Sequence, residues 1–279
     1  MINFNGTIIP NNSNSLVQNR AFLYGDAVFE TVKIIDAKIL FLEDHYFRLM
    51  SSMRVVRMEI PMNFTMEYFE KQIIDLAKAK NLENSARARI TVFRNEGGYY
   101  LPVNNTISFL INAESLENKL YSIDQKEYQV DLYTDFYVTK QLLSSIKTTN
   151  KILNVTASIY ANENDLDNCL LLNDSKNVVE ALQGNVFMLK GNKLITPPIS
   201  EGCLNGVMRK QILALAKKIE NLEVVEEIIS PFDLQKADEL FITNVIKGIQ
   251  PISKYRKKEY ATDLANILVQ KLNEFISIA

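Results

Sequence analysis

Two stretches in the first half of the chain carry different hydrophobic repeats, and together they restrict the fold more than any other feature. In residues 65–80 apolar side chains recur at spacings of three and four, which predicts a helix with one buried face. In residues 88–93 apolar and polar side chains alternate, which predicts a strand. A second helix is expected over 43–56 and a second strand over 107–111. The first half should therefore be an α+β domain with helices packed on a sheet.

A polar and charged stretch over residues 114–126 shows little periodicity, which is typical of a connection between domains. We expect an N-terminal α+β domain over 1–116, an interdomain connection over 117–126 and a C-terminal domain over 127–279. The elements expected after the connection are a helix following Lys147, strands over 169–172 and 185–189, and helices from 207 to about 219 and from 260 to 276.

Composition narrows the class of partner. The 279 residues are 47% hydrophobic and 23% charged, with a formal net charge of −2, so the chain can bury a core but has no basic character that would favour nucleic acid. A small-molecule substrate fits better. No apolar run approaches the length of a membrane span, and the two cysteines, Cys169 and Cys203, lack the spacing of a redox or metal motif. We expect a cytoplasmic protein with free thiols, and assign no metal ligands.

Lys147 is a candidate nucleophile. An exposed surface charge is the ordinary alternative for any lysine, but its neighbours Leu142, Leu143 and Ile146 are apolar. Partial removal of the amine from water would lower its pKa and free it for attack and proton transfer. The apolar side chains expected to anchor the following helix are Ile152, Val155 and Ile159.

Residues 204–209, Leu-Asn-Gly-Val-Met-Arg, open a predicted amphipathic helix with a glycine at its entry. The backbone amides of Val207 and Met208 would then point outward from a helix N-terminus, which is a favourable position for an anion such as a phosphate. Arginine is the usual second donor to such a group.

These segments, taken in order, resemble the class IV aminotransferase family of fold-type IV enzymes, which use pyridoxal 5′-phosphate (PLP). Lys147 lies in the sequence Ser-Ile-Lys-Thr-Thr-Asn, and Glu180 precedes an Asn-Val-Phe triplet like the family's Asn-Leu-Phe. The resemblance implies two domains with the active site between them. It also implies that Lys147 holds the cofactor aldehyde as a Schiff base and that Glu180 pairs with the pyridine nitrogen. A carboxylate at the edge of a turn is the alternative for Glu180.

Three further segments match family patterns. Residues 45–49, His-Tyr-Phe-Arg-Leu, match a motif whose arginine grips the phosphate, so Arg48 is our choice; His45 is expected to pack rather than to act as a base. Residues 24–31, from Tyr24 through Phe29 to Thr31, match a substrate-side wall, or form an ordinary turn before a strand. Thr243 and Asn244 match a loop near the phosphate and the substrate. By resemblance we expect a homodimer, with the aromatic tip at residues 99–101 as a lid or a simple hairpin turn.

The reaction is open between two members of the family. The leading interpretation is a 4-amino-4-deoxychorismate lyase, which forms p-aminobenzoate and pyruvate through a cofactor-linked substrate, with Lys147 removing the proton and Thr31 bonding the leaving group. The alternative is an aminotransferase that moves an amino group from a small, branched-chain-like amino acid to a 2-oxo acid. Branched-chain enzymes usually have tyrosine where this chain has Ile152 and a hydroxyl residue where it has Val245. A scaffold without activity is a third hypothesis, disfavoured because Lys147, Glu180 and Arg48 are all present.

Overall fold

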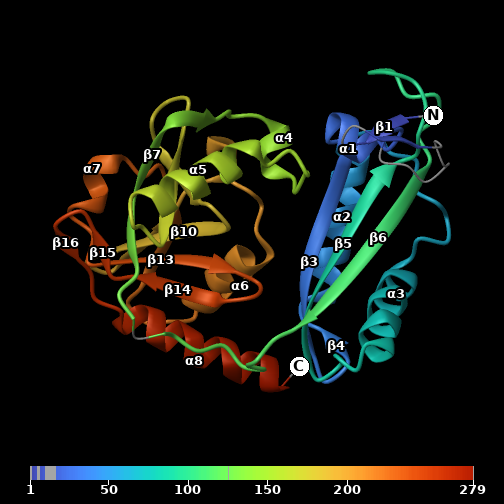
Figure 1. Ribbon diagram of the computed structural model, residues 1–279. Coiled ribbons are helices and arrows are strands. Elements are labelled where there is room, and N and C mark those ends of the chain that lie inside the picture. The colour runs from blue at the N-terminus through green and yellow to red at the C-terminus, as the bar shows by residue number, and fades with distance from the viewer. Residues whose placement is uncertain (1, 5–6, 10–16, 125, 279) are drawn as a thin grey trace.

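The computed structural model of the protein describes residues 2–4, 7–9, 17–124 and 126–278, and places two sheet-based halves side by side (Figure 1). The first half holds an antiparallel four-stranded sheet in the order β4-β3-β5-β6. Its strands are β3 (Ala27–Ile35), β4 (Lys38–Ile39), β5 (Ser85–Arg94) and β6 (Ile107–Ser115). A separate pair, β1 (Ile2–Phe4) and β2 (Thr7–Ile9), precedes this sheet.

Helices α2 (Leu42–Val55) and α3 (Met66–Ala79) cover one face of this sheet. Along β5 every second residue is buried, because those side chains point into the core that the helices close. The two helices predicted for this half are confirmed within one residue, and the strands predicted over 88–93 and 107–111 are confirmed as parts of the longer strands β5 and β6. The opposite face of the sheet, which carries the alternate side chains, is turned toward the second half of the molecule (Figure 1).

The second half is built on a larger mixed sheet in the order β12-β11-β10-β9-β8-β7-β15-β16, and β13 pairs with both β10 and β14. Its strands are β7 (Gln129–Val138), β8 (Asn168–Asn173), β9 (Val178–Ala181), β10 (Gly184–Lys190), β11 (Lys193–Thr196), β12 (Glu223–Glu226), β13 (Glu239–Asn244), β14 (Gly248–Ile252), β15 (Lys254–Tyr255) and β16 (Lys258–Glu259). The predicted strands at 169–172 and 185–189 are confirmed as parts of β8 and β10.

Helices α6 (Val207–Ala216) and α8 (Asp263–Ile278) pack together against this sheet. The rings of Phe187 and Phe241 stack beneath them with centroids 5.3 Å apart. The remaining helices are α1 (Arg20–Tyr24), α4 (Leu142–Ser145), α5 (Ile152–Glu163), α7 (Pro231–Leu234) and the short 3-10 helix η1 (Ile199–Glu201).

The last helix begins three residues later than predicted. Tyr260 lies outside the helix: its amide donates to the Ser253 carbonyl, and its hydroxyl donates to the Leu234 carbonyl. The helix starts at Asp263 because the carboxylate of Glu239 accepts hydrogen bonds from the first-turn amides of Leu264 and Ala265.

The anchoring predicted for α5 is wrong. Its side chains Ile152, Val155 and Ile159 are 75%, 50% and 52% exposed, and the helix instead packs through Ala157 and Ala161. The small alanines let the helix lie close to the sheet, which turns the larger apolar face outward.

The mixed α/β architecture is as expected. The division into 1–116, 117–126 and 127–279 stays a prediction. In the described part of the chain, no helix has both the length and the hydropathy needed to cross a membrane.

Candidate functional site

A cavity of about 430 Å³ lies between the two halves and is lined by most of the candidate site residues predicted from the sequence. From the first half come side chains of β3, β5 and α2, and from the second half come residues around Lys147, the β9–β10 turn, the start of α6 and the 243–247 segment. The predicted residues that line it are Phe29, Thr31, Arg48, Lys147, Glu180, Val207, Met208 and Asn244.

Lys147 is fixed to the first half although it follows the connection in sequence. The amide of Phe29 donates to the Lys147 carbonyl at 2.8 Å, and the amide of Thr149 donates to the Ala27 carbonyl at 3.0 Å. The Lys147 ammonium lies 4.6 Å from the centroid of the Phe29 ring. Burial, reinforced by the charge of Arg48, lowers the pKa of Lys147 to about 8, so a substantial fraction of the amine is neutral near physiological pH.

The desolvation of this lysine does not come from the leucines predicted to cause it. Leu142 and Leu143 are 65% and 50% exposed on α4, and only Ile146 is buried. The Phe29 ring and the facing sheet withdraw the amine from water instead. A side chain far away in sequence therefore performs the role assigned to near neighbours.

Glu180 lies on β9, between β8 and β10, so its backbone is held on both sides. Its Oε2 atom accepts a 2.9 Å hydrogen bond from the Leu204 amide, and no described group bonds its Oε1 atom. Burial raises the pKa of Glu180, which the Leu204 amide and the charges of Lys151 and Lys147 oppose. A cationic partner at Oε1 would favour the ionised form.

Arg48 is held by Glu30. Its Nε and Nη2 atoms each donate a 2.7 Å hydrogen bond to this carboxylate, and Nη1 donates to the Asn205 carbonyl at 2.9 Å. A guanidinium has five N–H donors, so two remain available to an anion. Burial would raise the pKa of Glu30, but Arg48 and His45 hold it down at about 2. His45 is fully buried and lies 2.7 Å from Glu30 through Nδ1.

The start of α6 faces the cavity, with Gly206 as its N-cap. A Cβ atom at Gly206 would lie 1.9 Å from Asn185 Oδ1, so no side chain fits there. Asn185 in turn donates to the Leu204 carbonyl at 2.8 Å. The amides of Val207 and Met208 belong to the first turn of the helix, where backbone N–H groups have no helical acceptor.

Two residues at the end of β13 complete this side of the cavity. The side-chain Oδ1 atom of Asn244 accepts hydrogen bonds from the backbone amides of Ile246 and Lys247, at 3.0 and 2.9 Å, which leaves the side-chain Nδ2 atom as a donor. Thr243, which precedes Asn244 in the same family-like loop, is buried, and its hydroxyl has no hydrogen-bond partner in the described part of the protein.

Two arginines that were missed also line the cavity. Arg89 is centred 3.7 Å from the Phe29 ring centroid, so Arg89 and Lys147 both contact that one ring. Arg87 reaches Glu114 only at 3.5 Å. In the sequence, these arginines resemble the exposed face of a strand. The signal that could have identified them is Lys33, which pairs with Arg87 across β3 and β5, so that these three basic residues share one face of the sheet with one acid, Glu114.

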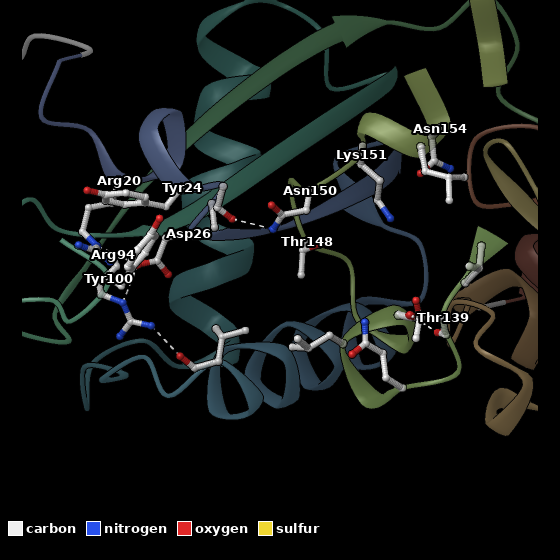
Figure 2. A pocket seen from close by; sticks show the side chains of 18 of the residues that line it. Arg20, Tyr24, Asp26, Arg94, Tyr100, Thr139, Thr148, Asn150, Lys151 and Asn154 are labelled. Carbon is white, nitrogen blue, oxygen red and sulfur yellow. Dashed lines mark hydrogen bonds and ion pairs between the residues drawn. The ribbon is translucent and has the colours of Figure 1, made fainter. Parts of the chain in front are cut away.

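Tyr24 does not line the cavity that contains Lys147. It lines a second cavity of about 570 Å³ on the other side of Lys151, Asn154 and Glu180, which both cavities share. Figure 2 shows Tyr24 there with Arg20 and Tyr100; its ring centroid lies 5.7 Å from that of Tyr100. A bulky aromatic at the end of α1 is directed by the left-handed turn at Gly25 away from the strand that carries Phe29.

The chemical groups of the 430 Å³ cavity, which contains Lys147, fit PLP. Lys147 supplies a partly neutral amine, and Glu180 supplies a carboxylate oxygen with no partner. The phosphate of PLP would need hydrogen-bond donors. The cavity offers the unused N–H groups of Arg48, the first turn of α6 and the unpartnered Thr243 hydroxyl.

Comparison with known proteins agrees with this chemistry. The family model for amino-transferase class IV matches residues 27–255. A candidate branched-chain-amino-acid aminotransferase of Methanocaldococcus jannaschii is 29% identical over 269 residues, which cover 92% of this chain and 88% of that protein.

Solved structures show the same fold. A branched-chain aminotransferase from Thermoproteus uzoniensis superimposes with a TM-score of 0.83 at 20% identity, covering 97% of this chain and 92% of that one. A candidate 4-amino-4-deoxychorismate lyase from Legionella pneumophila gives 0.82 at 21% identity, covering 92% and 94%. The chain belongs to the class IV aminotransferase family and is an enzyme of fold-type IV whose cofactor is pyridoxal 5′-phosphate.

Proposed function

We propose that this enzyme is an aminotransferase that moves an amino group between a small amino acid and a 2-oxo acid, one of them a dicarboxylic acid. The observation that carries the proposal is the shared contact of Arg89 and Lys147 with the Phe29 ring, at 3.7 and 4.6 Å. A substrate carboxylate bound by Arg89 would have its neighbouring carbons within reach of the lysine amine. Arg87 offers a second guanidinium to a second carboxylate in the same cavity.

Bound PLP supplies an electron sink for the carbanion formed when the amino-bearing carbon loses a proton. Lys147 is the group proposed to take up that proton and return it, because its amine is partly neutral near pH 8 and lies between the two halves. Glu180 is proposed to hold the pyridine nitrogen. The phosphate is assigned to Arg48, to the amides of Val207 and Met208, and to Asn244.

The lyase remains the second candidate, and Thr31 is the observation that favours it. Thr31 lines the cavity on the same strand face as Phe29, where its hydroxyl is available to a leaving enolpyruvyl group. In that reaction Lys147 would remove a proton from the amine-bearing ring carbon, and pyruvate would leave as the ring becomes aromatic.

A paired assay on the PLP-loaded protein tests both. One arm follows pyruvate and p-aminobenzoate release from 4-amino-4-deoxychorismate. The other follows glutamate formation from 2-oxoglutarate with L-Leu, L-Ile, L-Val or D-Ala as the amino donor. Glutamate formation without an aromatic product is the expected result; aromatic product without any amino acceptor would overturn the aminotransferase and establish the lyase.

The proposed assembly is a homodimer. The apolar side chains of Ile152, Val155 and Ile159 on α5 are exposed, as are Leu142 and Leu143 on α4, and Leu143 lines the 570 Å³ cavity. Exposed apolar patches of this kind favour association with another protein surface. Tyr24 and the 99–101 tip, assigned as substrate wall and lid, would lie near the second copy. A cytoplasmic location also stays a prediction.

Light scattering after gel filtration measures the assembly directly. The expected mass is that of two chains, and Val155→Asp, on the exposed face of α5, should shift it to one. A protein that runs as a single chain before substitution would remove the dimer from the proposal.

A further inference from the structure

Lys33 is a buried cation with no acid beside it. It lies on β3 two residues after Thr31, and 2% of its surface is exposed. Its ammonium is 4.2 Å from the ring centroid of Tyr121, and in the part of the chain that the structure describes no carboxylate forms an ion pair with it. A buried charge without a counterion is costly. Burial accordingly lowers the pKa of Lys33 to about 8.

Lys33 faces a cavity of its own, of about 290 Å³. The wall is formed by Lys33, by residues 115–118 and 120–122 of the chain after β6, and by Ile246 and Lys247. Figure 1 shows this chain segment running from β6 toward α8. Lys247, an exposed lysine, is a second basic residue in the wall, and the acid in the wall, Glu117, is exposed and forms no ion pair with either lysine.

The aromatic ring beneath Lys33 is held firmly. The Tyr121 hydroxyl donates to the Val245 carbonyl at 2.6 Å, and its backbone amide donates to Asn273 Oδ1 at 3.0 Å. A Cβ atom at Gly248 would lie 2.7 Å from the ring, so the turn fits closely against it. The cation therefore lies in a formed site rather than on a mobile surface.

This cavity adjoins the candidate active site. Phe29, Thr31 and Lys33 alternate along one face of β3, and the first two line the cavity that contains Lys147. Ile246 and Lys247 belong to the walls of both cavities. Lys33 also pairs across the sheet with Arg87, which places their side chains on the same face. Arg87, which lines the 430 Å³ cavity, and Lys33, which lines the 290 Å³ cavity, thus form a row of cations between the two.

We propose that the 290 Å³ cavity is an anion-binding site in which the ammonium groups of Lys33 and Lys247 hold a carboxylate or phosphate group. The anionic group belongs either to the far end of a long acidic substrate that extends past Thr31 or to a separate small molecule beside the 245–248 turn. The recognition chemistry is the same for both sources. The site does not depend on which reaction the enzyme catalyses.

Binding is measured first, without turnover, by titration calorimetry of the PLP-loaded protein with inorganic phosphate and with glutarate, because bound cofactor already fills its own phosphate site. Lys33→Met should weaken the binding of at least one anion by tenfold or more. Lys33→Arg, which keeps the charge, should restore it, and Lys257→Met, which removes an exposed lysine elsewhere, should leave it unchanged. Visible absorbance and far-UV circular dichroism check that each variant folds and holds PLP.

A spectroscopic readout accompanies the titration. In protein labelled by reductive ¹³C-methylation of its lysines, the Lys33 signal, assigned by its loss in Lys33→Met, should titrate to higher pH when the anion is added, since a bound anion favours the charged amine. Equal anion affinity in wild type and Lys33→Met, or an unchanged titration of Lys33 at saturating anion, would overturn the proposal.

Two kinetic arms then identify the source. If the anion is the substrate's far end, Lys33→Met should raise KM for 2-aminopimelate much more than for aspartate. If it is a separate molecule, phosphate or glutarate should change kcat for a short donor in wild type but not in Lys33→Met. A protein inactive in both arms would contradict the proposed aminotransferase, while the calorimetric result would still decide the anion site.

Discussion

Arg48 and Glu30 meet through two parallel 2.7 Å hydrogen bonds, Nε to Oε1 and Nη2 to Oε2, in a place where the carboxylate is fully buried. The pair fixes the plane of the guanidinium and leaves its remaining N–H groups directed elsewhere. Glu30 is thus a positioning residue for the arginine that we assign to the phosphate.

The first prediction concerns this pair. At pH 7, Glu30→Gln should lower the free energy of unfolding by about 3 kcal/mol, because the shift of the Glu30 pKa from 4.5 to about 2 corresponds to an energy of that order. A lowered folded-state pKa gives stability that is present above pH 4.5 and is lost as the pH falls toward 2. The difference between wild type and variant in urea unfolding should therefore shrink over that range.

Glu114→Gln is the matched control, because this exposed acid meets Arg87 only at 3.5 Å. It should change stability by less than about 0.5 kcal/mol at any pH. An equally large effect of both substitutions would mean that the Glu30 pair has no special role.

The second prediction concerns the amine of Lys147. The rate at which the cofactor-free protein captures PLP covalently should rise with pH and reach half its maximum near pH 8, since only the neutral amine attacks. Stopped-flow absorbance in the visible range follows the capture. Lys147→Ala should fold, bind PLP without a covalent bond and lose turnover by at least about 1000-fold; a rate that does not change between pH 6.5 and 9.5 would contradict the assignment.

The third prediction separates the two roles of the Glu180 carboxylate. Glu180→Gln keeps an acceptor for the Leu204 amide but has no charge to hold a protonated ring nitrogen. It should retain PLP and the native stability while slowing turnover by about 100-fold or more. Glu180→Ala should in addition lower the melting temperature, because the Leu204 amide loses its acceptor. Unchanged kcat in the glutamine variant would remove Glu180 from the mechanism.

The fourth prediction tests the close approach at the start of α6. Gly206→Ala would place a Cβ atom 1.9 Å from Asn185 Oδ1, which must displace either the Asn185 side chain or the first turn of the helix. PLP affinity, measured by equilibrium dialysis, should fall at least about tenfold, or about 1.4 kcal/mol. Gly191→Ala is the control: Gly191 has a positive φ but lies in open space, so the substitution should affect stability and leave PLP affinity unchanged.

Much of the secondary structure could be predicted because the signal is local. The helix over 66–79 and the strand over 85–94 follow from the spacing of apolar side chains, and both are confirmed. The start of α8 could not be predicted in this way. The apolar pattern continues back to Tyr260, but the helix begins where Glu239, on a distant strand, provides acceptors for its free amides.

Part of the candidate site could be predicted from the sequence for the same reason. Lys147, Glu180 and Arg48 stand in ordered sequence motifs, whereas Arg87, Arg89 and Lys33 have only the alternation of an exposed strand. What makes them notable is the pairing of β3 with β5 and the opposite half that closes over that face. Tyr24 shows the converse: its motif suggested the substrate wall, but the turn at Gly25 directs it into the other cavity.

The hydrogen bonds that join Phe29 and Ala27 to residues 147 and 149 limit how the chain can be divided into functional fragments. Lys147, the lysine that we propose binds the cofactor, is encoded after the predicted connection, yet its backbone carbonyl accepts a hydrogen bond from a strand encoded before that connection. Cutting the gene at the connection would therefore yield no fragment able to form a bond with the cofactor by itself. A chimera that takes one half of the chain from a relative should be functional only if β3 and the segment around Lys147 come from the same protein.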